Sequence, residues 1–191
     1  NFPNGFISAV DDIQTGGEPS QTDLLNMTDW SHLCRERRRL HLLQNGLLKG
    51  GKPTNCDYFL YNTQYSCDFD WISIIDMSNV TTAKHMLSSC KFGANTKVVP
   101  KLETSSLQDA SYMFSNSSEI TTIFGLDMNS IKTTSNMLQG VKNIANLTLY
   151  NIRTSVQIGG GSNYSNVLTV DSLVHTIREL CKTAIGPTIT T

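Results

Sequence analysis

Pairs of large apolar side chains recur along this chain at a nearly constant spacing, and this repeat limits its possible folds more than any other feature. The first members of the pairs lie at positions 59, 86, 113 and 137, so the steps between them are 27, 27 and 24 residues. A fixed period in this range predicts an array of similar units, each burying its apolar face against its neighbours. The pairs are Phe59-Leu60, Met86-Leu87, Met113-Phe114 and Met137-Leu138.

A second set of residues recurs at the same steps as the apolar pairs. Short apolar segments at 71–80, 98–107 and 124–131 follow the first three pairs, and their acidic and closing apolar residues recur at steps of 27 and 24. Because Ile, Val and Leu favour strands, each segment predicts one short strand, stacked in parallel on its neighbours about 4.8 Å apart. Each apolar pair predicts a helix packed behind the strand. The recurring residues are Asp76, Glu103 and Asp127, followed by Val80, Leu107 and Ile131.

The combined pattern predicts an α/β fold, a right-handed solenoid with one helix and one short parallel strand per unit of about 24–27 residues. Residues 1–22 are predicted to be an extended entry segment, and 23–152 an array of four to five units. Residues 153–191 predict an incomplete last unit: a strand, a glycine turn and an amphipathic helix capped by Asp171. The predicted repeat core is Leu33, Phe59, Leu60, Met86, Leu87, Met113, Phe114, Met137, Leu138, Val80, Leu107 and Ile131.

The composition excludes partners that need a strong electric field. Among the 191 residues charged side chains make up 16%, and the formal net charge is -1. A share of about 25% is more usual, so nucleic acid is not an expected partner. No run of 18 apolar residues is present, so no membrane span is predicted.

No pattern in the chain nominates a metal, a cofactor or a catalytic group. The five cysteines contain no CxxC pair and are predicted to be buried free thiols. The four histidines have no partner at ligand spacing, and no GxSxG motif is present. We expect no enzyme activity, although weak calcium binding by the acidic loop of Asp68, Asp70 and Asp76 stays open.

Two groups of side chains are candidates for ligand contact. The loops that follow the pairs vary in length and carry aromatic residues, whose rings favour contact with sugars and protein partners. The only basic cluster is the RERRR stretch at 35–39, which a helix could point toward an acidic surface. Packing of the aromatic rings and a solvated helix face are the alternatives. The candidates are Tyr61, Tyr65, Phe69, Phe92, Arg35 and Arg38.

These motifs resemble the BspA-type leucine-rich repeats, whose units read as a helix ending in Met-Phe, a Ser/Asn/Cys turn and an apolar strand closing on Asp-(Thr/Met)-Ser-Asn. The nearest segments are ASYMFSNSSEITTIFGLDMNSI (110–131) and IIDMSNVTTAKHMLSSC (74–90). DWSHLCRERRRLHLL (29–43), and LTLYNI (147–152) followed by DSLVHTIREL (171–180), are similar to the versions in minor structural proteins of tailed phages. The resemblance covers roughly residues 24–185. It implies a leucine-rich-repeat solenoid that recognises protein or glycan and has no catalytic residues.

We therefore expect a non-enzymatic component of a phage virion, located on the tail or baseplate. It would present its repeat scaffold to other virion proteins or to a bacterial surface protein or glycan, and virion symmetry would allow an oligomer. The alternative is a fragment of a bacterial cell-surface adhesin, extracellular in location, that binds host protein or glycan. An enzyme is the third hypothesis.

Overall fold

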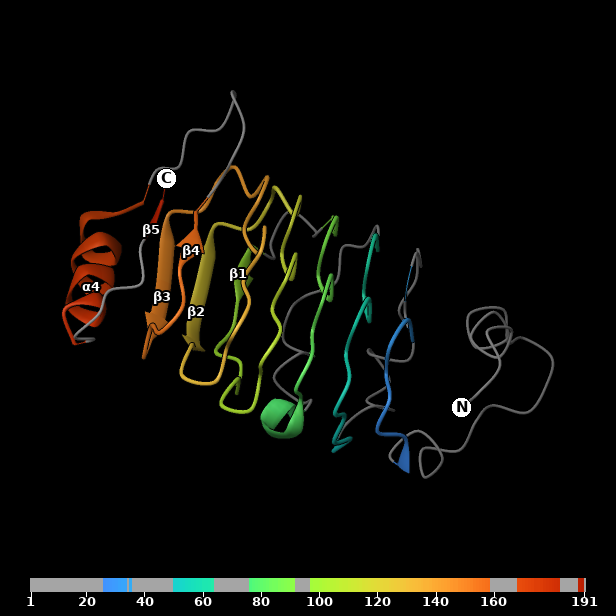
Figure 1. Cartoon of the computed structure of the whole chain (residues 1–191). Helices are drawn as coiled ribbons and strands as arrows, with labels where there is room; N and C mark the ends of the chain where they lie inside the picture. The colour runs from blue at the N-terminus through green and yellow to red at the C-terminus, as the bar shows by residue number, and fades with distance from the viewer. Residues whose placement is uncertain are drawn as a thin grey trace.

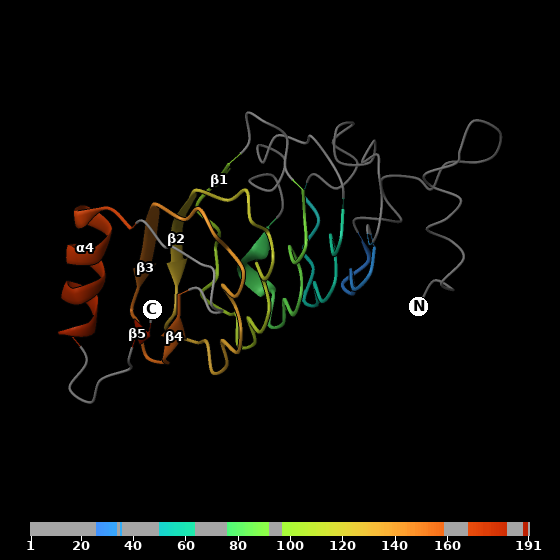
Figure 2. The same cartoon turned by 90° about the horizontal axis from the view of Figure 1, so that it is seen from above.

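The computed structural model describes residues 26–33, 35, 50–63, 76–91, 97–158, 168–182 and 189–190. Successive passes of the chain lie side by side in one row, which ends at a single helix (Figures 1 and 2). The elements, in chain order, are the 3-10 helix η2 (Met77–Asn79), the strands β1 (Val98–Val99), β2 (Thr122–Asp127), β3 (Asn146–Tyr150) and β4 (Val156–Gln157), the helix α4 (Val170–Leu180) and the strand β5 (Ile189–Thr190).

Two small parallel sheets lie toward the α4 end of the row. The larger sheet has the order β1-β2-β3, with Val98 opposite Thr122 and Thr122 opposite Asn146. Its register shifts between Ile123 and Leu126, where Gly125 has a φ of +70°. The smaller sheet pairs β4 with β5.

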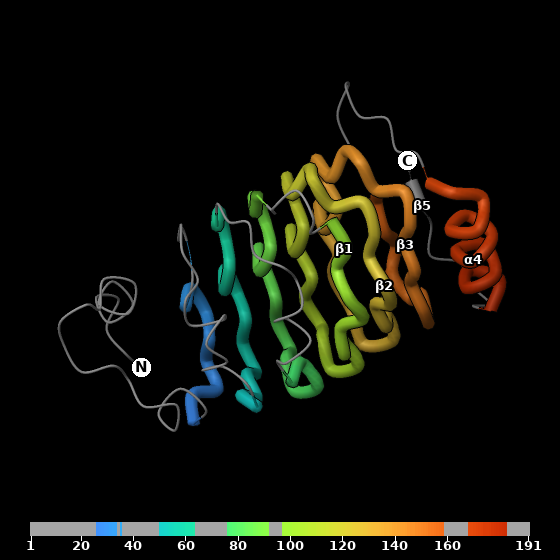
Figure 3. The backbone as a smooth tube through the Cα atoms, turned by 180° about the vertical axis from the view of Figure 1, so that it is seen from behind, coloured from blue at the N-terminus to red at the C-terminus, as the bar shows by residue number. Residues whose placement is uncertain are grey.

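Outside these two sheets, a ladder of backbone hydrogen bonds joins successive passes of the chain. Isolated parallel bridges join Asp29 to Asn55, then Thr82, Asp109 and Thr133 in succession. The tubes of successive passes can be followed along this ladder in Figure 3. The period found in the sequence therefore corresponds to hydrogen-bonded turns of the chain.

The predicted solenoid of helix-and-strand units, with its right-handed leucine-rich-repeat form, is wrong. The described residues contain one α-helix with complete bounds, α4, together with the β1-β2-β3 sheet and the short β4-β5 pair. The apolar pairs at 59–60, 86–87, 113–114 and 137–138 lie in six-residue turns at 57–62, 84–89, 111–116 and 135–140.

A helix cannot form at the pairs because their backbone groups are used in two other ways. The N–H of Met86 bonds the carbonyl of Ala83 three residues back, whereas the N–H of Leu87 bonds Met113 on the neighbouring pass at 2.8 Å. The residue before each pair has positive φ, for example 53° at His85. A left-handed residue cannot continue a right-handed helix.

The predicted strands are also shorter than expected. The segment 98–107 forms only the two-residue β1, and Pro100, which has no N–H to donate, follows it directly. In the segment 71–80 the described part contains η2, whose first turn is capped by the carboxylate of Asp76 accepting from the N–H of Ser78 at 3.0 Å.

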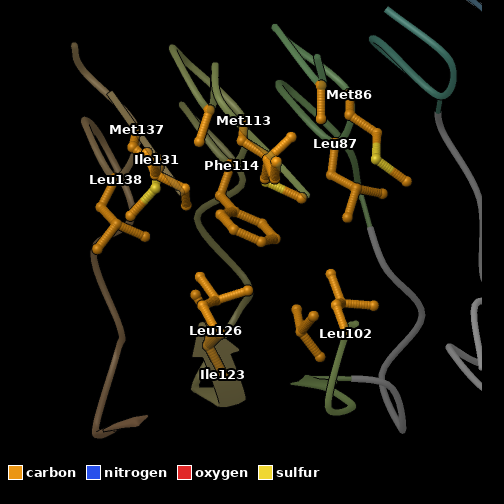
Figure 4. Close-up of a cluster of buried hydrophobic side chains, with 14 of the residues drawn as sticks. Met86, Leu87, Leu102, Met113, Phe114, Ile123, Leu126, Ile131, Met137 and Leu138 are labelled. Atoms are coloured by element: carbon orange, nitrogen blue, oxygen red, sulfur yellow. The ribbon is translucent and has the colours of Figure 1, made fainter. Parts of the chain in front are cut away.

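The apolar pairs form the centre of one continuous core. Figure 4 shows the pairs of three turns and the strand residues Ile123 and Leu126 pointing into the same interior. Phe114 is fully buried, and all twelve residues of the predicted repeat core are at most 4% exposed. Burying a side chain of this size stabilises the fold by roughly 1.5–3 kcal/mol, so the pairs account for much of the stacking energy.

The helix α4 closes the end of the row by packing against β3. Its N-cap is Thr169, whose hydroxyl accepts from the N–H of Ser172, rather than the predicted Asp171. Ser172 and Glu179 in turn accept the edge N–H groups of Leu147 and Asn151, at 3.0 and 3.1 Å. A polar helix face therefore replaces the next strand at this edge.

The cysteines only partly follow the prediction. Cys56 and Cys90 are buried free thiols, whereas Cys181 is a free thiol on the surface, so its predicted burial is wrong. Burial raises the pKa of the Cys90 thiol to about 12, although hydrogen bonds with Thr63 and Ser117 oppose the shift. Cys34 and Cys67 lie outside the described residues. The predicted division into segments 1–22, 23–152 and 153–191 stays a prediction.

Candidate binding site

Four aromatic rings stack in one column, and each ring comes from one of four successive turns. The ring centroids of His32 and Tyr58 lie 4.8 Å apart, those of Tyr58 and His85 4.7 Å, and those of His85 and Tyr112 4.5 Å. Neighbouring planes differ by 6°, 13° and 8°, so each ring lies nearly parallel to the next. We call these four residues the ring column.

The column follows from the backbone of the turns. Its four residues occupy the same place in successive turns and have φ values of 60°, 57°, 53° and 58°. Parallel passes in a hydrogen-bonded ladder lie about 4.8 Å apart, which is close to the stacking distance of planar rings. Asn136 follows in the next turn with a φ of 55°, so the column ends where its position carries an amide.

Arg35 and Tyr61 lie beside the column. The Arg35 guanidinium carbon is 5.6 Å from the Tyr58 ring centroid and 5.2 Å from that of Tyr61, both within cation–π range. Tyr61 meets the rings of Tyr58 and His85 edge-on, at 5.4 and 5.8 Å. The ring column with Arg35 and Tyr61 is called the aromatic patch below.

The patch is partly open to solvent. His32 and Arg35 are exposed, whereas Tyr58, Tyr61 and His85 are half-buried. Desolvation lowers the pKa of His85, against a smaller opposing effect of the Asp57 carboxylate, so this ring is neutral at pH 7. Among the described residues its Nδ1 atom is buried without a hydrogen-bond partner.

Acidic and basic side chains next to the ring column join neighbouring turns. The Asp57 carboxylate accepts from the Thr82 hydroxyl at 2.6 Å and from the Lys84 N–H at 2.8 Å. The Lys84 ammonium lies 3.2 Å from the carboxylate of Asp109 on the next pass. These contacts tie neighbouring turns together.

Two of the predicted contact residues, Tyr61 and Arg35, are thus brought together in one patch. Four others, Tyr65, Phe69, Phe92 and Arg38, lie outside the described residues. Sequence reasoning missed the ring column itself, although the signal was present. The four ring residues directly precede an apolar residue of the repeat core, at 33, 59, 86 and 113.

A polar cavity of about 270 Å³ lies at the carboxyl ends of β2 and β3. Four of its polar residues are bonded in pairs: the Asp127 carboxylate accepts from the Asn151 amide at 3.1 Å, and Glu179 accepts from the Lys182 ammonium. A ligand would have to displace these partners. The cavity is lined by Lys101, Leu102, Glu103, Asp127, Tyr150, Asn151, Glu179 and Lys182.

The described part of the chain contains no group of three or more His, Cys, Asp and Glu side chains placed to hold a metal ion. Asp68 and Asp70, which could have bound calcium with Asp76, lie outside it. No helix within the described ranges has the length and apolar character needed to cross a membrane.

Comparisons with protein-family models, with curated proteins and with solved structures found no match to this chain. The resemblance seen in the motifs therefore stays an expectation. Any assignment of function depends on the residues themselves.

Proposed function

We propose that this chain is a non-enzymatic binding module of a tailed-phage virion, which uses the aromatic patch to contact a host-surface glycan or another protein. The observation that carries the proposal is the partly exposed ring column with Arg35 and Tyr61 beside it. The similarity of 29–43 and 171–180 to phage structural proteins supports the phage assignment.

The chemistry of the patch suits a neutral or acidic polar surface. Aromatic rings bind the apolar faces of sugars and anchor protein interfaces, because they bury a large area with little loss of side-chain freedom. Arg35 adds a positive charge that is held over two rings, so a planar amide or a carboxylate could bind it from the solvent side. Rings that already stack on their neighbours have less freedom to lose, which lowers the ordering cost of binding.

The binding proposal is tested with an array of bacterial surface polysaccharides probed by the full chain. Tyr61→Ala and Arg35→Ala are each expected to weaken binding about tenfold, the loss of roughly 1.4 kcal/mol. Tyr150→Ala and Arg153→Ala are matched controls, because both residues are exposed and lie outside the patch. Equal losses in the controls, or no loss in the patch variants, would contradict the proposal.

The location is tested separately by mass spectrometry of purified phage particles. The chain is expected in the particle at a fixed ratio to other tail proteins. The alternative, a bacterial cell-surface adhesin fragment that binds host protein or glycan, predicts the chain in the cell-wall fraction and its absence from particles. That outcome would refute the phage assignment while leaving the aromatic patch open to either function.

A further inference from the structure

The helix α4 is inverted relative to an ordinary surface helix. Its buried residues are the polar Ser172, Thr176 and Glu179. A surface helix normally turns its apolar stripe inward and its polar side to water. The apolar residues that face outward are Val170, Leu173, Val174 and Ile177, which are 74%, 42%, 39% and 58% exposed.

The inversion has a structural cause. The edge of β3 presents backbone groups that need hydrogen-bond partners, and α4 supplies them from Ser172, Glu179 and His175, which donates to the Leu149 carbonyl at 2.9 Å. The face toward β3 must therefore be polar, and the apolar stripe has to point away. Within the described ranges the four residues of the stripe are exposed. Figure 1 shows α4 at the end of the row of passes.

We propose that two copies of this chain associate end to end through this stripe, with their α4 helices antiparallel. We call the stripe, together with Asp171 and Arg178, the α4 outer face. The inference is independent of the aromatic patch, which lies in the turns. It assigns an interaction surface and names its occupant as a second copy of the chain.

The charges on α4 favour a second copy of the chain as the partner, with its α4 helix antiparallel. Asp171 lies in the first turn of α4 and Arg178 in the last, and both are exposed. Residues seven apart lie on the same side of a helix, so the two charges flank the apolar stripe along one border. In an antiparallel pair, Asp171 of each copy would lie beside Arg178 of the other. A parallel pair would place the charged borders of the two helices on opposite sides of the contact, where Asp171 and Arg178 could not pair, and its helix dipoles would also repel.

The size of the face sets the strength of the contact. One helix of three turns offers less than the roughly 800 Å² per partner that stable interfaces bury. The dimer is therefore expected to be weak and to depend on concentration. Tethering many copies in one assembly would raise their effective concentration and favour the contact.

The test is sedimentation velocity of the full chain over a wide concentration range. The wild type is expected to pass from monomer to dimer, and Val174→Glu to weaken the association at least about tenfold. The matched control is Val98→Glu, because Val98 is 40% exposed on β1, away from α4. Circular dichroism and thermal melting of each variant show whether the fold is kept.

A charge exchange tests the antiparallel arrangement without touching the apolar residues. Asp171→Arg alone and Arg178→Asp alone should each weaken the dimer several-fold, and the double exchange Asp171→Arg/Arg178→Asp should restore it. Failure of the double variant to recover would overturn the arrangement. A wild type that stays monomeric would overturn the dimer, and a lower melting temperature of Val174→Glu in that case would mean that the same chain covers the stripe.

Discussion

At the scale of single residues, the turns depend on backbone conformations that most side chains avoid. Tyr58 and Tyr112 adopt φ values of 57° and 58°, a region favoured by glycine and asparagine. The cost is of the order of 1 kcal/mol per residue or more. It is offset because the same conformation places each ring against the next, where stacked aromatic pairs contribute about 0.5–1.5 kcal/mol.

Gly140 offers a direct test of these turns. It has a φ of +74°, and a Cβ there would lie 2.3 Å from Asn116 Oδ1 and 3.2 Å from Asn116 Cα. Gly140→Ala should therefore lower the free energy of unfolding by about 1–3 kcal/mol, measured by urea denaturation.

The control for Gly140 is Gly50→Ala. Gly50 has a similar φ of +83°, but a Cβ there would meet nothing within 4 Å. The control should lose only the backbone part of the effect, about 1 kcal/mol. Equal losses for the two variants would mean that contact with Asn116 does not matter.

At the scale of elements, α4 takes the place of a further strand. Ser172, His175 and Glu179 are spaced so that they meet alternate backbone groups along β3 and just beyond its end. These groups are the N–H of Leu147, the carbonyl of Leu149 and the N–H of Asn151. An unpaired strand edge is a template for aggregation, and covering it with a helix removes that risk.

Glu179→Ala should loosen this contact. The N–H of Asn151 would lose the carboxylate acceptor of a partly buried hydrogen bond, which costs about 1–3 kcal/mol, so its amide should exchange faster with deuterium. Glu179→Gln keeps an acceptor and should show a smaller effect. Glu103→Ala, at an exposed site on the same cavity, is the control, and unchanged exchange at Asn151 in Glu179→Ala would contradict the role of this contact.

The same contact should weaken in acid. The hydrogen bond from Lys182, with a further one from the Asn151 N–H, lowers the pKa of Glu179 below its ordinary value of 4.5, although burial opposes the shift. The folded state therefore holds fewer protons than the unfolded chain. Its contribution to stability is present above pH 4.5 and is lost as the pH falls through the lowered pKa.

At the scale of the whole molecule, stability comes from passes that bury their apolar pairs against each other. Successive turns are joined by backbone hydrogen bonds such as those from Leu60 to Met86 and from Phe114 to Met137. A cavity in one turn therefore weakens both neighbouring interfaces.

Phe114→Ala should lower the free energy of unfolding by about 3–5 kcal/mol in urea denaturation, because Phe114 is fully buried. Phe124→Ala is the matched control, since Phe124 is 51% exposed on β2, and its loss should be well below that of Phe114. A small effect of Phe114→Ala would mean that the turns do not share one core.

The candidate site shows which of its features could be predicted from residue patterns. Tyr61 was predicted as a contact residue because it is an aromatic residue of a variable loop, and Arg35 because it belongs to the basic cluster. Their meeting beside Tyr58 joins two different passes of the chain. The ring column could have been found by looking one position before the repeat-core residues at 33, 59, 86 and 113. Its stacking could not, because that needs the positive φ and the parallel ladder, which are tertiary features.

The sequence by itself determined the period of the chain and the burial of its repeat core, since apolar spacing depends on nothing but residue order. The tertiary structure alone decided what the repeated unit is. The backbone groups at the apolar pairs could bond within a helix or to a neighbouring pass, and local patterns do not distinguish the two. The neighbouring pass supplied the carbonyl groups, so turns formed in place of helices. In the same way, the hydrogen-bonding groups at the edge of β3 require the polar side of α4 to face them. From the helical pattern alone, that polar side would be expected to face water.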